Sequence, residues 1–175
     1  MGYPLEGIEC EIRDELEQKV PHNEVGTLWV KGGNIMMGYY KAPEATEKTL
    51  KNGWLNTGDL ATLSPKGILA ITGRSKDLII HKGFNIYPAE IENVLMQHPA
   101  VFRAAVIGQD DTAAGQVPVA FIATKFNYSS LEANLRNWCA NNLASYKIPR
   151  KFICMEELPM NNTGKIDKKI LRNHL

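Results

Sequence analysis

Asp59 is the side chain with the clearest potential for nucleotide chemistry, and it follows Gly58 at the end of a strand-like run. A carboxylate can accept two hydrogen bonds from a ribose 2′,3′-diol, which is why nucleotide sites often hold one. Taken alone, an aspartate in this setting is more typical of a turn, where it caps its own backbone. Arg74, beside Gly73, is by itself typical of a surface charge.

Lys165 is a second candidate, because it ends the tripeptide Thr-Gly-Lys at residues 163–165. A Walker phosphate loop would need a glycine five residues before Gly164 and a serine or threonine after the lysine. Pro159 and Ile166 occupy these positions and exclude that motif. Composition alone therefore favours a solvated loop lysine.

Histidine and cysteine spacing predicts neither a zinc site nor a disulfide framework. The cysteines are odd in number, widely spaced and without a CxxC pair, which indicates reduced buried thiols of a cytosolic protein. The histidines share no ligand spacing. The residues concerned are His22, His81, His98, His174, Cys10, Cys139 and Cys154.

Residues 73–92 combine several structural signals, and the chain is organised around them. The apolar run 78–80 predicts a buried strand, and residues 82–85 predict a tight connection in which Gly83 can adopt a positive φ. Pro88 suits the first position of a helix. Ile91, Val94 and Leu95 recur at helical spacing, so a short amphipathic helix is expected to follow.

Upstream of this stretch the pattern is mostly that of strands. Alternation at residues 8–13, the run 27–30 and a hairpin of 60–63 with 68–72 predict strands, with one short helix from Pro43. Such strands without a partner sheet would leave open edges, so residues 1–72 are expected to be an incomplete domain.

Downstream, strands and helices alternate. We expect strands at 101–108, 117–124 and 152–155, and helices at 129–143 and 167–174. Ser129 and Glu132 fit a capping box for the longer helix. This order predicts an α/β (α+β) unit, a short sheet covered by helices, with its boundary between residues 73 and 77.

The bulk composition constrains function only weakly. The chain has 175 residues, 44% of them hydrophobic, a net charge of +1 and no apolar run near 18 residues, so no membrane span is expected. Residues 73–175 carry thirteen basic and nine acidic side chains, which suits a phosphate-rich small ligand. The excess is too mild to indicate nucleic acid.

Four ordered segments resemble motifs of adenylate-forming enzymes. GRSKDLIIHKGFNIYPAEIE at 73–92 is similar to their hinge-and-turn motif, and its IYPAEIE ending has the form seen in acyl-CoA synthetases. Residues 26–39 resemble the strand segment before the nucleotide site, WLNTGDL at 54–60 resembles the ribose motif, and PMNNTGK at 159–165 resembles the catalytic-lysine loop.

The resemblance implies two domains. Residues 1–75 would be the terminal, β-rich and incomplete part of the N-terminal AMP-binding domain. Residues 76–175 would be the small mobile C-terminal domain. The family's phosphate loop and acyl pocket lie upstream, so this chain alone is expected to be an inactive fragment.

The same resemblance implies roles for individual residues. Lys165 would be the adenylation lysine, because a mobile ammonium lowers the barrier when a carboxylate attacks an α-phosphate and pyrophosphate leaves. Gly83 would line the pantetheine tunnel, where a side chain would narrow the passage. The remaining roles are nucleotide binding by Asp59 and Arg74, the hinge at Lys76, and contact with the phosphates of coenzyme A by Lys147, Arg150 and Lys151. Without the resemblance, such a basic cluster is more typical of a solvated surface.

The function expected on these grounds is that of an acyl-CoA synthetase, a ligase of fatty acids or other carboxylates, working in the cytoplasm. ATP/AMP and coenzyme A would be its nucleotide ligands, and Mg²⁺ would arrive with ATP and bind mainly outside this chain. Its partners would be the carboxylate and the missing N-terminal domain. The alternatives are an enzyme that passes acyl groups to a carrier protein, a peptide-synthetase adenylation domain, which IYPAEIE disfavours, and a non-catalytic binding module.

Overall fold

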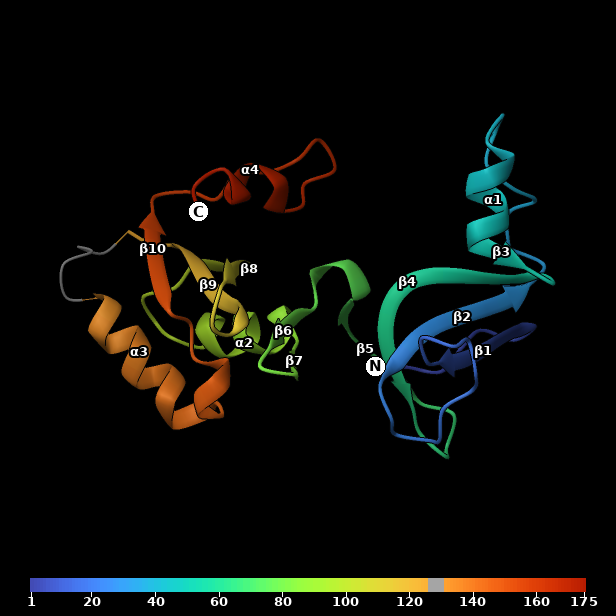
Figure 1. Cartoon of the computed structure of the whole chain (residues 1–175), viewed down its shortest axis with the longest axis horizontal. Coiled ribbons are helices and arrows are strands. Elements are labelled where there is room, and N and C mark those ends of the chain that lie inside the picture. Colours follow the sequence, from blue (N-terminus) through green and yellow to red (C-terminus); the bar gives the residue numbers. More distant parts are fainter. Residues whose placement is uncertain (126–130) are drawn as a thin grey trace. The chain divides into compact units, whose positions relative to one another are not determined.

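A computed structural model of the chain describes residues 1–125 and 131–175. The chain forms two compact units, Met1–Lys76 and Asp77–Leu175, and each is considered by itself (Figure 1). The predicted combination of a short helix-covered sheet with preceding strands is confirmed. The assignment of the units to parts of two enzyme domains stays a prediction.

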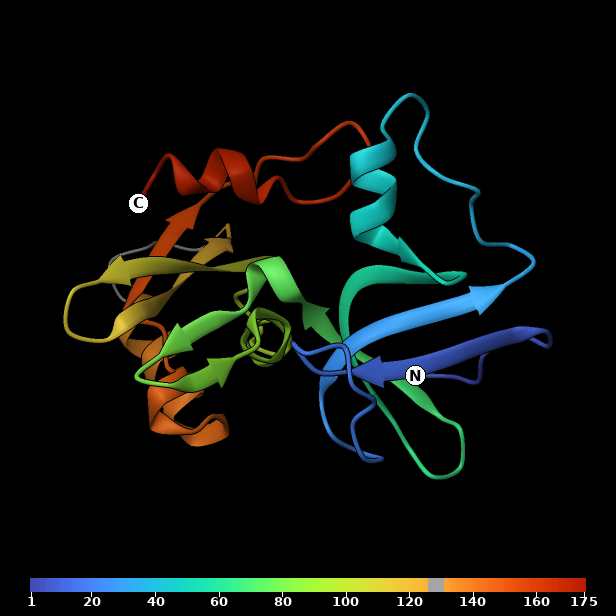
Figure 2. The same cartoon turned by 45° about the vertical axis from the view of Figure 1, so that its right-hand side comes forward.

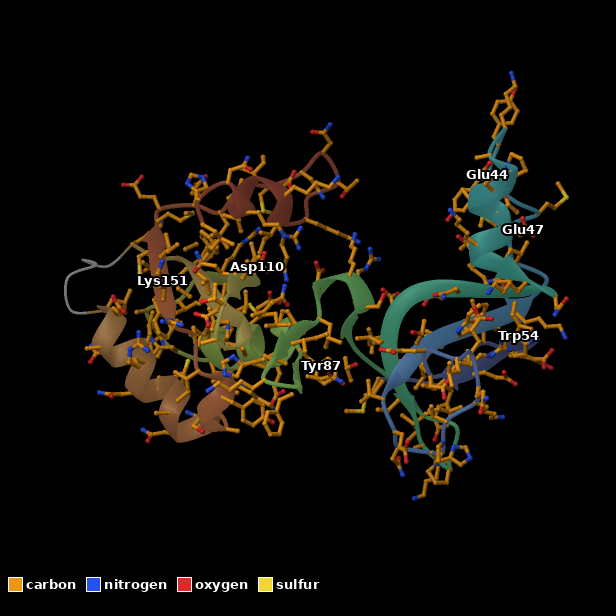
Figure 3. All side chains as sticks on the ribbon, viewed as in Figure 1. Glu44, Glu47, Trp54, Tyr87, Asp110 and Lys151 are labelled. Carbon is orange, nitrogen blue, oxygen red and sulfur yellow. The ribbon has the colours of Figure 1, made fainter. Side chains whose placement is uncertain are left out.

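The first unit is an antiparallel sheet with the order β1-β2-β4-β3, and β5 pairs with β4. Its strands are β1 (Ile8–Arg13), β2 (Gly26–Gly32), β3 (Leu50–Lys51), β4 (Trp54–Leu63) and β5 (Leu69–Arg74), and helix α1 (Pro43–Thr49) precedes β3. Ile12, Leu28 and Ala61 form its buried centre, as period-two alternation along the strands requires. The guanidinium of Arg13 lies 4.7 Å from the ring centre of Trp29 and 4.9 Å from that of Trp54, which Figure 3 labels.

The second unit is built around β9. This strand pairs antiparallel with β8 and parallel with β10, and β6 joins it at His81 and Gly115. The bounds are β6 (Ile79–His81), β7 (Phe84–Ile86), β8 (Arg103–Asp111), β9 (Gly115–Ala123) and β10 (Lys151–Met155). Helix α3 (Leu131–Asn142) lies between β9 and β10 in sequence, which is the crossover that a parallel pair needs.

Helices cover both faces of this second sheet. One face of β8 and β9, represented by Val106 and Ile122, packs with α2 (Pro88–Met96) and α3. The opposite face, represented by Ile107 and Phe121, packs with α4 (Lys168–Arg172) and Leu158. Figures 1 and 2 show α4 on the other side of β8 and β9 from α2 and α3.

Three details differ from the predictions or lie beyond them. Ile80 is 52% exposed, so only Ile79 of the apolar run 78–80 is fully buried, because alternate side chains of a strand point to opposite faces. The connection is a two-residue turn with φ of 50° at Lys82 and 82° at Gly83, and residues 84–86 form the unpredicted strand β7. Ser129, the expected helix cap, lies outside the described residues.

Candidate functional site

Asp59 and Arg74 are brought together on the first sheet. They occupy paired positions on β4 and β5, and Arg74 Nε lies 3.0 Å from Asp59 Oδ1. The Asp59 side chain is 28% exposed and the Arg74 side chain 53%. A carboxylate and a guanidinium on adjacent strands, both open to solvent, can bind a ribose diol and a phosphate oxygen of one nucleotide.

Local hydrogen bonds fix the backbone that carries Asp59. The hydroxyl of Thr57 accepts from the Asp59 N–H at 3.1 Å and donates to the Leu28 carbonyl at 2.9 Å. Asn56 Oδ1 accepts from the N–H of Gly58, whose φ is 71°. Residues 56–59 thus form an irregular stretch of β4, at the register shift between β2 and β4, and side-chain hydrogen bonds hold it against β2.

Lys76 lies in the 3-10 turn Ser75–Asp77 at the junction of the two compact units. The hydroxyl of Ser75 donates to the Gly58 carbonyl at 3.1 Å, which ties the start of this turn to the first unit. Lys76 is exposed and, among residues 1–125 and 131–175, its side chain makes no ion pair. Its backbone can therefore change without breaking an ion pair between its side chain and a described residue.

The loop that carries Lys165 is closed by a single amide side chain. Asn161 Oδ1 accepts from the Thr163 N–H at 3.0 Å, from the Thr163 hydroxyl at 2.7 Å and from the Lys165 N–H at 2.9 Å. The Asn161 N–H donates to the Lys165 carbonyl at 2.7 Å, and Gly164 has a φ of 74°. The backbone of this lysine is therefore held while its side chain extends into solvent without an ion pair to any described residue.

Two of the three cations in the basic segment 146–151 already pair with carboxylates, so they are less available to bind a phosphate than the composition suggests. Lys147 Nζ lies 2.6 Å and 2.7 Å from the two carboxylate oxygens of Glu90 on α2. Arg150 pairs with Asp111 at the end of β8. Lys151, labelled on β10 in Figure 3, is exposed and has no ion pair with any residue that the structure describes.

Backbone N–H groups lower the pKa of the Asp111 carboxyl group. The Ala113 N–H holds the pKa of Asp111 below its usual value, and the Ala114 N–H and Arg150 act in the same direction against the effect of burial. Asp111 therefore keeps its negative charge at neutral pH and keeps Arg150 paired.

Gly83 lies close to the basic segment within the second unit. The rings of Phe84 and Tyr146 stack with centroids 4.9 Å apart, so the β6–β7 turn adjoins the residue before Lys147. A Cβ built on Gly83 would meet no atom within 4 Å, but its φ of 82° is one that other residues rarely adopt. The fold thus brings the β6–β7 turn, which contains Gly83, against the segment that contains Lys147.

The other titratable groups in the described part of the chain form no metal site, and the buried thiol of Cys139 is not activated. Within the described ranges, 1–125 and 131–175, no group of three or more His, Cys, Asp or Glu side chains is arranged to hold a metal ion. Burial raises the pKa of Cys139 to about 11, so its thiol stays neutral near pH 7 and is a poor nucleophile. No helix in the described part of the chain is long and apolar enough to cross a membrane.

Sequence reasoning missed the partners of the predicted residues. Asn161 carried a usable signal, because asparagine followed two residues later by threonine is typical of a side-chain-capped turn. Glu90 and Asp111 carried none, since they lie 57 and 39 residues from Lys147 and Arg150. Only the packing of α2 and β8 reveals that these cations already have partners.

Comparison with known proteins gives one consistent result. The family model of the AMP-binding enzyme C-terminal domain matches residues 90–165. The chain is 40% identical over 173 residues to a long-chain-fatty-acid–CoA ligase of Escherichia coli O6:H1, covering 99% of this chain and 31% of the relative. It is 43% identical over 172 residues to a 2-succinylbenzoate–CoA ligase of Bacillus cereus strain Q1, covering 98% of this chain and 35% of the relative.

Solved structures agree with these relatives. An o-succinylbenzoate CoA synthetase of Bacillus subtilis, in complex with its acyl-adenylate intermediate, matches 97% of this chain and 34% of its own, with a TM-score of 0.90 and 41% identity. An amide bond synthetase of Marinactinospora thermotolerans matches 99% of this chain and 36% of its own, with a TM-score of 0.92 and 34% identity. The chain spans about a third of the length of the curated relatives it matches.

Proposed function

We propose that this chain, which matches the AMP-binding enzyme C-terminal domain at residues 90–165 and is similar to the C-terminal portion of acyl-CoA ligases, supplies the alternating catalytic loops of an acid–thiol ligase. The whole enzyme would join a carboxylate to coenzyme A in two half-reactions driven by ATP. The observation that carries this proposal is Lys165, an exposed ammonium that has no ion pair with a described residue, on a loop whose backbone is held by Asn161.

In the first half-reaction a carboxylate oxygen would attack the α-phosphorus of ATP, and pyrophosphate would leave. Two anions approach each other in this step, and negative charge grows on the leaving oxygen. Lys165 would stabilise both, because its ammonium has no competing carboxylate among the described residues and is carried on an ordered backbone. A preorganised charge of this kind acts mainly on the transition state.

Asp59 and Arg74 would hold the nucleotide during both half-reactions. The carboxylate would accept the ribose hydroxyls, while the guanidinium, 3.0 Å away, would donate to a hydroxyl or phosphate oxygen. Mg²⁺ would enter with ATP, held by phosphate oxygens and by residues outside this chain, because the described residues offer no cluster of ligands.

In the second half-reaction the thiol of coenzyme A would attack the acyl carbon of the mixed anhydride, and AMP would leave. The β6–β7 turn at Gly83 would then face the nucleotide in place of the Lys165 loop. We propose that the second unit rotates about Lys76 to make this exchange, since that exposed residue lies at the junction of the units. Lys151 would meet the phosphates of coenzyme A, and Lys147 and Arg150 would join it only where their pairs with Glu90 and Asp111 open.

The test is an assay of the full-length protein with ATP, coenzyme A and a carboxylate panel that includes fatty acids of several lengths and 2-succinylbenzoate. We expect pyrophosphate release that depends on the carboxylate, and thioester formation that depends on coenzyme A. The 175-residue chain alone is expected to release no pyrophosphate. A full-length protein inactive with every carboxylate, or an active isolated chain, would contradict the proposal.

The acceptor needs its own measurement, because one similar structure is an amide bond synthetase. The same acyl-adenylate should be offered coenzyme A, an acyl-carrier protein and simple amines in parallel. Faster transfer to coenzyme A than to the other acceptors is the expected result.

A further inference from the structure

One edge of strand β8 pairs with no described strand, and side chains take the place of a neighbouring strand in hydrogen bonding to its backbone. The strand pairs with β9, and no other described strand pairs with its second edge. At that edge the Val106 N–H donates to Glu92 Oε1 at 2.8 Å, and the Val106 carbonyl accepts from Lys168 Nζ at 3.2 Å. Val106 is 1% exposed, so these backbone groups are shielded from water and need protein partners.

The two side chains also pair with each other. Lys168 Nζ lies 2.7 Å from Glu92 Oε1, and the Lys168 and Glu92 side chains are 23% and 18% exposed. Glu92 belongs to α2 on one face of the sheet, whereas Lys168 begins α4 on the other. Glu92, Lys168 and the Val106 backbone therefore form an edge clasp, which connects the two helical layers around the side of β8.

This edge clasp lies next to the loop of the catalytic lysine. Lys168 follows Lys165 by three residues, and Asp167 between them caps α4 through the N–H groups of Lys169 and Ile170. The Asp167 N–H also donates to the Pro159 carbonyl at 2.8 Å, which closes the loop at its base. The outgoing end of the loop is thus fixed to the sheet by the Lys168 ammonium.

Apolar packing holds the same loop from its other side. Leu158 and Leu171 are buried against β8 and β9, and Ile166 packs beside them. Such packing fixes the loop near the sheet but is not directional. The hydrogen bonds of the edge clasp are directional, so they set the angle at which the loop leaves α4.

We propose that Glu92 and Lys168 are positioning residues for Lys165, which they orient through the start of α4 in the adenylation half-reaction. The inference rests on the proposed function. A displacement of about 1 Å at a reacting group can lower a rate by about a hundredfold, so even a small tilt of the loop should be measurable. Neither residue is expected to contact a substrate.

The test uses the full-length enzyme with Lys168→Met, Glu92→Gln and the double variant, and Lys169→Met as the matched control. Lys169 is the next residue and is exposed, with no side-chain ion pair to a described residue. We expect Lys168→Met to lower kcat for adenylation about tenfold, with KM for ATP unchanged. Thioester formation from supplied acyl-adenylate should stay within about twofold of wild type. Because both single changes open the same clasp, the double variant should be no slower than the slower single variant.

Hydrogen exchange of the same proteins gives a readout that does not need activity. Peptides within residues 159–167 should take up deuterium faster in Lys168→Met than in Lys169→Met, because the loop loses its anchor. Unchanged exchange, adenylation equal to that of Lys169→Met, or equal losses in both half-reactions would overturn the proposal. If the wild-type enzyme forms no adenylate, the proposed function fails, and the exchange comparison still decides whether the clasp orders the loop.

Discussion

The two cationic segments of the second unit differ in whether their charges are already neutralised. Lys165 carries an exposed ammonium without an ion pair to any described residue, whereas Lys147 is held by both oxygens of Glu90 and Arg150 by Asp111. In the sequence both segments look like basic loops. A phosphate that binds Lys147 would therefore have to displace a carboxylate, whereas one that binds Lys165 would have to displace only water.

Replacing Lys165 with alanine should produce the largest effect. We expect adenylation to fall about a thousandfold, roughly 4 kcal/mol in transition-state free energy, because the variant lacks the charge that stabilises the leaving oxygen. Thioester formation from supplied acyl-adenylate should survive. Pyrophosphate release and acyl transfer are measured separately, with Lys169→Ala as control. Equal loss in both half-reactions would show that Lys165 serves a shared or structural role.

Lys76→Pro tests whether the two segments alternate at one nucleotide. Lys76 lies in a 3-10 turn, where φ is about −60°, close to the value that proline imposes. Adenylation should stay within about tenfold, or 1.4 kcal/mol, while thioester formation is mostly lost. Single-turnover assays of each half-reaction measure both. Normal rates in both would show that Lys76 is not the pivot, and circular dichroism would reveal a damaged fold.

The glycines of the two loops allow a matched comparison. Gly83 and Gly164 have φ of 82° and 74°, and a Cβ at either would meet no atom within 4 Å. Alanine should therefore destabilise each loop by about the same amount, roughly 1 kcal/mol, through backbone strain. Gly164→Ala should slow adenylation, and Gly83→Ala should slow thioester formation, each by about tenfold.

Gly73→Ala is the control for this pair, because Gly73 has neither a positive φ nor a close neighbour. Thermal unfolding measures the strain, and the half-reaction assays measure the selectivity. If both variants slowed the same half-reaction, the division of labour between the two loops would be wrong.

The smallest effects are expected within the basic segment. Lys151→Ala should raise KM for coenzyme A about fivefold, since an exposed lysine paired with a phosphate contributes about 1 kcal/mol. Lys147→Ala should change KM by less than about twofold, because Glu90 already occupies that ammonium. Steady-state kinetics with varied coenzyme A measure both. A larger effect at Lys147 would mean that its pair with Glu90 opens on binding.

Glu90→Gln tests the pairing of Lys147 by changing its partner instead of the lysine itself. Removing the carboxylate charge would free the Lys147 ammonium, so KM for coenzyme A should fall about twofold or more. An increase in KM would indicate that the pair of Glu90 and Lys147 orders the site.

Much of the fold was predictable from local pattern. The apolar alternation of β1, the turn glycine between β6 and β7, and Pro88 at the start of α2 each depend on a few consecutive residues. Strand β7 was missed because it has only three residues, so its alternation of Phe84, Asn85 and Ile86 is too short to be distinguished from a connecting segment. The exposure of Ile80 was missed because an apolar triplet does not reveal that one face is uncovered.

Prediction of the site from sequence was limited because residues that contact each other in the fold lie far apart along the chain. Asp59 and Arg74 were identified separately, but their 3.0 Å contact depends on the register of β4 against β5. The pair of Glu92 and Lys168 joins residues 76 positions apart, and no local rule relates them. Motif resemblance can indicate which residues matter, whereas partner identity depends on how the helices pack on the sheet.

The parallel pairing of β10 with β9 has a consequence for the order of folding. Strands β8 and β9 form a continuous antiparallel hairpin, and Asp111 at its turn accepts hydrogen bonds from Ala113 and Ala114, so its contacts are local and should form early. Strand β10 pairs with the other edge of β9 only after α3 has crossed over the sheet, which makes its docking a late, non-local event. Since α4 follows β10, the loop that carries Lys165 should be among the last parts of the second unit to reach its final place. Until then one edge of β9 stays open to pairing with another chain, and refolding yield should fall as protein concentration rises.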